Sequence, residues 1–125
     1  MTHTEPSFGE FIIEKRKEKD LSARQLAIAL KISPVYMCDI EKGRRTSYSD
    51  EFLEKLKQIL SLSETDAERM YDLAAIARRT VSADLPEYIM ENELVRTALR
   101  TAKKHQAPDE KWGKFIREIL REEEG

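Results

Sequence analysis

The sequence has a single cysteine, Cys38, among its 125 residues. One thiol cannot form an internal disulfide, which excludes the class of small secreted domains that depend on disulfides. No apolar run approaches the roughly 20 residues that span a bilayer. The amino-terminal residues lack the basic and apolar segments of a secretory signal. We therefore expect a cytoplasmic protein that does not insert into a membrane.

Histidine, glycine and proline are also scarce. The two histidines, His3 and His105, belong to no cluster of potential ligands, and the sequence has neither an HExxH motif nor a glycine-rich phosphate loop. We expect no metal, no other cofactor and no enzymatic activity. Only four glycines and four prolines interrupt the chain, which favours a helix-rich fold.

The chain has no large excess of either charge, since its formal net charge is −2. Residues 1–60 hold eleven basic and ten acidic residues, and the remainder holds eleven and fourteen, so the two parts carry +1 and −3. A surface that binds nucleic acid would therefore have to be local.

What the sequence does contain is a succession of helical patterns, without the alternation typical of strands. The spacing of apolar residues predicts five helices in the first part of the chain, over about residues 8–19, 23–30, 34–42, 50–60 and 64–79. A linker over about 80–84 precedes a short helical turn at Pro86. Two further helices follow, one capped by Asn92 and one starting at Pro108. The predicted fold class is all-α.

Local signals define the ends of the second and third helices. Ser22 followed three residues later by Gln25 forms a capping box, in which each side chain satisfies the other residue's backbone N–H. Ser33 is expected to cap the next helix, and Pro34 fits its first position because the missing N–H is unpaired there anyway. Gly43 is expected to end that helix, since the residue after a helix often has a positive φ.

These two helices have the small and apolar residues that a helix-turn-helix needs. Ala27 is small enough for the other helix to cross it, and Ala29 is expected on one buried face with Leu26 and Leu30. Met37 and Ile40 are expected to hold the second of the two helices to the core. The pattern predicts a helix-turn-helix over about residues 22–43.

The stretches EKDLSARQLA, from Glu18, and ISPVYMCDIEKGRR, from Ile32, resemble the lambda-repressor and Cro-like regulators called the XRE family. The resemblance covers about residues 8–61, and a fainter one to extensions of such regulators begins at Asp84. It implies a five-helix lambda-repressor-like DNA-binding domain in residues 1–80.

The resemblance implies that the helix at about 33–42 enters the major groove of double-stranded DNA with its amino-terminal residues toward the base edges. The residues that would face DNA are Ser33, Pro34, Val35, Tyr36 and Asp39. Pro34, Val35 and Asp39 form a poor hydrogen-bonding set, which shifts weight toward recognition of DNA shape and deformability.

Basic residues beside that helix are expected to contact phosphates. Lys42, Arg44 and Arg45 follow it directly, and the alternative is a solvated basic loop. Arg24 stands one residue after the position where the family usually has a phosphate-binding glutamine, and it would take over that contact.

Two further residues follow from the resemblance. Arg16 and Glu41 match an arginine and a glutamate that form a structural ion pair in the family, so we expect that pair here. Lys31 occupies a turn position that is commonly glycine, at a cost of about 1 kcal/mol if its φ is positive.

Residues 81–125 are expected to form a helical extension for dimerisation or partner binding. An apolar stripe at helical spacing is its main feature, formed by Trp112, Phe115, Ile116, Ile119 and Leu120. It is either the surface of a homodimer, as paired half-sites on DNA would require, or it packs on the preceding helix or binds a ligand or partner protein.

The residues together predict a sequence-specific DNA-binding transcriptional regulator, and repression is the family's usual mode. The alternative is a protein-interaction module, such as an antitoxin or an adaptor, that retains the helix-turn-helix shell. Loss of DNA binding on replacement of Arg44 and Arg45 would separate the two functions.

Overall fold

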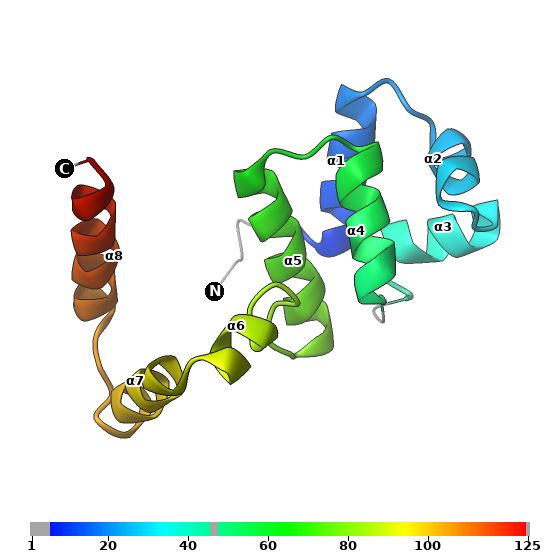
Figure 1. Ribbon diagram of the computed structural model, residues 1–125. Coiled ribbons are helices and arrows are strands. Elements are labelled where there is room, and N and C mark those ends of the chain that lie inside the picture. Colours follow the sequence, from blue (N-terminus) through cyan, green and yellow to red (C-terminus); the bar gives the residue numbers. More distant parts are fainter. Residues whose placement is uncertain (1–5, 46–47, 125) are drawn as a thin grey trace. The chain divides into compact units, whose positions relative to one another are not determined.

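The computed structural model describes residues 6–45 and 48–124, which excludes His3 (Figure 1). These residues form helices and no strands, so the all-α prediction is confirmed for the part of the chain described. The helices are α1 (Phe8–Glu18), α2 (Ala23–Leu30), α3 (Pro34–Glu41), α4 (Asp50–Ile59), α5 (Glu64–Arg78), α6 (Pro86–Glu91), α7 (Glu93–Lys104) and α8 (Asp109–Glu124).

The chain divides into two compact units, Met1–Pro86 and Glu87–Gly125. The first holds α1 to α5 and the second holds α7 and α8, while α6 begins at the last residue of the first unit. The domain boundary expected near residue 80 lies within the first unit. None of the described helices combines the length and the apolarity needed to cross a bilayer.

Serine residues start all five helices of the first unit. The serine Oγ accepts a hydrogen bond from a backbone N–H three residues later, at Ser7, Ser22, Ser33, Ser49 and Ser63. Each bond satisfies one of the free donors that every helix start leaves. The predictions for Ser22 and Ser33 are therefore confirmed.

Asn92 does not cap α7 as predicted. It occupies the position before the helix, but its side chain makes no capping hydrogen bond. Its Nδ2 instead donates to the backbone oxygen of Tyr88 in α6, 2.7 Å away. The amide is thus used to close the preceding turn, a local alternative open to asparagine side chains.

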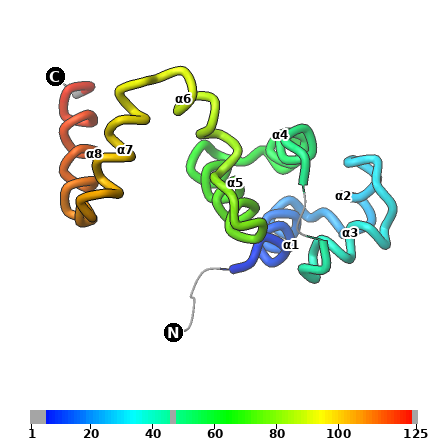
Figure 2. Tube along the Cα trace, turned by 90° about the horizontal axis from the view of Figure 1, so that it is seen from below, coloured from blue at the N-terminus to red at the C-terminus, as the bar shows by residue number. Residues whose placement is uncertain are grey.

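The core of the first unit lies among α1 to α5. Helix α1 packs against both α3 and α5, and α2 packs against α3 and α4 (Figures 1 and 2). The largest side chains with almost no exposure are Phe11, Ile12, Leu26, Met37, Ile40, Leu56, Leu60 and Met70. Burial of each such side chain contributes about 1.5 to 3 kcal/mol, so this cluster is the main source of the unit's stability.

The second unit has no comparable core. No described residue of α7 or α8 is buried, although both helices carry an apolar stripe. The exposed fraction of the predicted stripe on α8 ranges from 37% at Trp112 to 56% at Ile116. The stripe is therefore only partly covered within this unit.

Candidate nucleic-acid interface

The turn between α2 and α3 is sharp because Lys31 adopts a left-handed conformation, with φ 60° and ψ 40°. The N–H of Ile32 reaches back to the Ala27 oxygen at 3.0 Å, which closes the end of α2. Ala27 itself is fully buried, as the helix-turn-helix pattern requires. Ala29 is exposed, so its expected place on the buried side is wrong.

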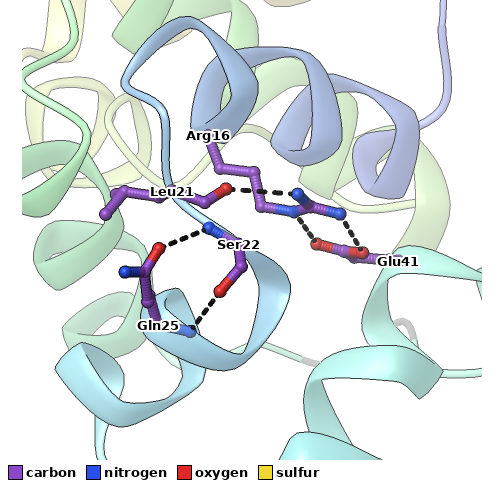
Figure 3. Close-up of polar contacts among 5 residues, drawn as sticks. All are labelled: Arg16, Leu21, Ser22, Gln25 and Glu41. Atoms are coloured by element: carbon purple, nitrogen blue, oxygen red, sulfur yellow. Dashed lines mark hydrogen bonds and ion pairs between the residues drawn. The ribbon is translucent and has the colours of Figure 1, made fainter.

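The side chains of Arg16 and Glu41 are in direct contact (Figure 3). Arg16 Nε donates to Glu41 Oε2 at 2.8 Å and Nη2 donates to Oε1 at 3.2 Å, a two-point pairing. Arg16 Nη1 also donates to the Leu21 oxygen at 3.2 Å. The two side chains are only 14% and 9% exposed, so the pair is largely shielded from water. One guanidinium thus joins α1, the segment that leads into α2, and the end of α3.

Gly9 is a second contact between α1 and α3, and sequence reasoning missed it. A Cβ atom at this position would lie 2.3 Å from the backbone oxygen of Glu41 and 2.8 Å from the backbone oxygen of Ile40. Only glycine leaves room for the end of α3 to pass so close. The signal in the sequence was a glycine inside a predicted helix, where that residue weakens the helix unless packing needs it.

Helix α3 has one buried and one open side. Met37 and Ile40 are fully buried, while Val35 is 71% exposed and Ser33 and Pro34 are also exposed. The remaining residues on the open side, Tyr36, Cys38 and Asp39, are partly exposed. Ser33 Oγ accepts a hydrogen bond from the Tyr36 backbone N–H at 3.0 Å, so the proton of the Ser33 hydroxyl is free to be donated elsewhere.

The basic segment after α3 folds back onto that helix. Gly43 turns the chain with φ 77°. The backbone N–H groups of Arg44 and Arg45 both donate to the backbone oxygen of Asp39, at 2.8 and 3.3 Å. Arg44 Nη1 lies 3.4 Å from Asp39 Oδ1, and the Arg45 guanidinium lies 4.8 Å from the centre of the Tyr36 ring. Four residues of the predicted set are therefore brought together on one surface.

Lys42 and Arg24, two further predicted phosphate contacts, are exposed. Neither side chain forms a hydrogen bond or an ion pair with the described residues. Both ammonium and guanidinium groups are therefore available to a ligand, but no contact fixes their direction.

Tyr48 is hydrogen-bonded to the basic segment, a role that the sequence did not indicate. Its hydroxyl donates to the Arg45 oxygen, and its ring stacks on Phe8 with a centroid separation of 4.3 Å. Arg78 Nη1, from the end of α5, donates to the backbone oxygen of Tyr48 at 3.2 Å. Burial, and to a lesser degree the charge of Tyr36, raises the pKa of Tyr48 to about 12, so the phenol stays protonated near neutral pH.

The arrangement offers hydrogen-bond donors, positive charge and a small apolar contact on one open helix surface. No group of three or more metal-ligating side chains occurs among the described residues. The predicted stripe on α8 belongs to the second unit. Comparison with protein-family models, curated proteins and solved structures finds no match to this chain.

Proposed function

We propose that this protein is a sequence-specific DNA-binding transcriptional regulator, and specifically a repressor, that reads the major groove with α3. The observation that carries the proposal is the open side of α3, flanked by Arg44 and Arg45, on a helix whose other side is fully buried. The resemblance of residues 8–61 to the XRE family, with its lambda-repressor-like fold, supports the same function.

The dimensions of α3 suit this role. With its side chains an α-helix is about 10–12 Å across, which a major groove about 12 Å wide admits, and the eight residues of α3 extend about 12 Å along the helix axis. Val35 can contact a thymine methyl group, and the Ser33 hydroxyl can donate to a phosphate oxygen. Pro34 offers only shape. Base discrimination therefore depends on few hydrogen bonds and draws on the deformability of the operator.

The cations around α3 supply most of the binding free energy. Arg24, Lys42, Arg44 and Arg45 provide about four phosphate contacts per subunit, and each contact releases counterions from the duplex. The affinity for DNA should therefore fall steeply with salt concentration. A net charge of −2 is no obstacle, because the acidic excess lies outside residues 1–60.

The alternative function is a protein-interaction module that keeps the helix-turn-helix shell. Asp39 favours this alternative, because its carboxylate stands on the open side of α3 and would repel phosphates. Its contact with Arg44 reduces that repulsion. The paired arginines favour DNA over a protein partner, since they add positive charge where a duplex backbone would pass.

The test is selection of bound fragments from a random DNA pool at about 150 mM salt, followed by sequencing. We expect an enriched two-fold motif. The Arg44→Ala/Arg45→Ala variant should lose at least tenfold in affinity for the selected site. The matched control is Lys17→Ala/Lys19→Ala, which removes two exposed charges from the end of α1 and should bind nearly as well as the unchanged protein. No enrichment, or equal effects of the two variants, would move the assignment to the protein-interaction module.

A further inference from the structure

The second unit, Glu87–Gly125, is too small to form a stable core of its own. Units of about 40 residues usually need a disulfide, a metal or association with another chain. This unit has no cysteine, and no metal-ligating cluster lies in its described part. Its two long helices expose large apolar side chains, including Leu94 at 85% and Ile116 at 56%. Association with another surface is the remaining source of stability.

Helices α7 and α8 together form an apolar groove of about 450 Å³. The side chains that line most of it are Val95, Ala98, Leu99, Ala102, Trp112 and Phe115. The apolar surface continues beyond the groove, because Ile116, Ile119 and Leu120 do not line it and are about half exposed. The apolar stripe thus runs from Trp112 to Leu120, about 13 Å along α8, and together with the groove it forms a surface that suits another helix.

The two helices carry opposite net charges. Helix α7 has four basic residues and one acidic residue, giving +3, and α8 has four basic and six acidic residues, giving −2. Lys114 pairs with Glu118 within α8, but no ion pair between described residues joins α7 to α8. A second copy of the same unit offers both an apolar stripe and the complementary charges.

We propose that the apolar surface of α7 and α8 is the interface of a homodimer, in which α7 of each copy packs against α8 of the other in a four-helix bundle. The reverse pairing, α7 against α7, would bring two helices of charge +3 together. The two-fold arrangement buries the groove and the outer part of the stripe on both copies at once. The inference goes beyond the proposed function, because association requires no DNA.

The test is the mass of the full chain in solution without DNA, measured by sedimentation over a range of concentrations. We expect twice the chain mass of 14.6 kDa. The Ile116→Glu/Ile119→Glu variant should raise the dissociation constant at least about 100-fold, since two apolar contacts per copy are lost and carboxylates are introduced. The control Lys114→Glu changes the charge by the same −2 on the polar side of α8, where the Lys114 side chain is 73% exposed, and should remain a dimer.

A second pair of variants tests the arrangement of the helices. Lys103→Glu/Lys104→Glu turns α7 from +3 to −1, the same sign as α8, and should weaken the dimer at least about tenfold. The control Lys17→Glu/Lys19→Glu makes the same change in net charge on α1 and should have little effect. Equal weakening by both variants would overturn the pairing of α7 with α8.

The remaining outcomes also decide the matter. A chain of 14.6 kDa at every concentration overturns the homodimer and leaves a different protein, or another surface of the same chain, as the occupant. A dimer that survives Ile116→Glu/Ile119→Glu forms through some other surface. Helix content, followed by circular dichroism, shows whether a variant has simply unfolded. A dimer that fails to select DNA would leave this inference intact and overturn the proposed function instead.

Discussion

Gly9 in α1 and Glu41 at the end of α3 approach so closely that a Cβ atom on Gly9 would lie 2.3 Å from the backbone oxygen of Glu41. The same glutamate uses its carboxylate to pair with Arg16, which lies two turns later in α1. Helix α1 thus holds both the backbone and the side chain of one residue. Since Glu41 is the last residue of α3, these two contacts set the direction in which the open side of α3 points.

Replacement of Gly9 by alanine tests the backbone contact. The added methyl group meets two carbonyl oxygens that cannot rotate away, so α1 and α3 must separate, and we expect a loss of about 2 kcal/mol or more in the free energy of unfolding. Urea unfolding followed by circular dichroism measures the loss. The matched control is Gly113→Ala in α8, where the nearest atom is the mobile Arg117 Nη1 at 3.2 Å. That variant should be as stable as the unchanged protein or up to about 1 kcal/mol more stable.

The ion pair is tested by Arg16→Met. The variant leaves the Glu41 carboxylate shielded and without its partner, so the free energy of unfolding should fall by about 3 kcal/mol. The double variant Arg16→Met/Glu41→Leu removes both charges and should recover part of that loss. Unchanged stability of Arg16→Met, or additive losses in the double variant, would show that the pair does not hold α3 in place.

Features set by neighbouring residues could be predicted from the sequence. The Ser22 and Gln25 capping box and the Ser33 cap each need only a short segment, and all are present. The turn after α2 is similar, because the residue after a helix often has a positive φ, and Lys31 has one. The pairing of Arg16 with Glu41 spans 25 residues, and the family resemblance rather than spacing suggested it.

Features set by packing between distant residues could not be predicted. The close approach at Gly9 depends on the path of α3, and the role of Tyr48 depends on where Phe8 and Arg45 come together. Ala29 was placed on the wrong side because alanine fits both buried and exposed positions, so it adds little to a helical pattern. The sequence also does not indicate what the α8 stripe packs against, because a stripe shows which side of a helix is apolar and not what covers it.

Tyr48 predicts a loss of stability at alkaline pH. Burial raises its pKa to about 12 from an ordinary value of 10.0, so the folded state favours the protonated phenol. Its contribution is complete below about pH 10 and is lost as the pH rises toward 12, at a total of about 2 to 3 kcal/mol. The Tyr48→Phe variant cannot ionise there, so its stability should fall less between pH 9 and pH 11.5. Lys15 and Tyr71, whose pKa values are also raised, are common to both proteins and cancel in the difference. Parallel stability profiles would show that Tyr48 ionises as freely in the folded state as in the unfolded one.

Asp39 is the residue at which the proposed function makes its sharpest prediction. Its carboxylate lies 3.4 Å from Arg44 Nη1 on the open side of α3. The carboxylate therefore lowers the positive charge that Arg44 can offer to phosphates, and it repels those phosphates directly. In the groove it can also accept a hydrogen bond from the N4 amino group of cytosine, which would make it a determinant of sequence preference.

The Asp39→Asn variant should therefore change affinity and specificity in opposite directions. Loss of one negative charge should tighten binding to any duplex by about three- to tenfold, and the tightening should shrink as salt screens the phosphates. The ratio of affinities for the selected site and random DNA should fall, because an asparagine amide pairs with adenine better than with cytosine. Titration of both duplexes at two salt concentrations measures both quantities. The control Glu68→Gln removes an equal charge from an exposed position on α5 and should alter neither. If Asp39→Asn behaved like this control, the open side of α3 would not face DNA, and the protein-interaction module would become the better explanation for the exposed Val35 and the two arginines beside it.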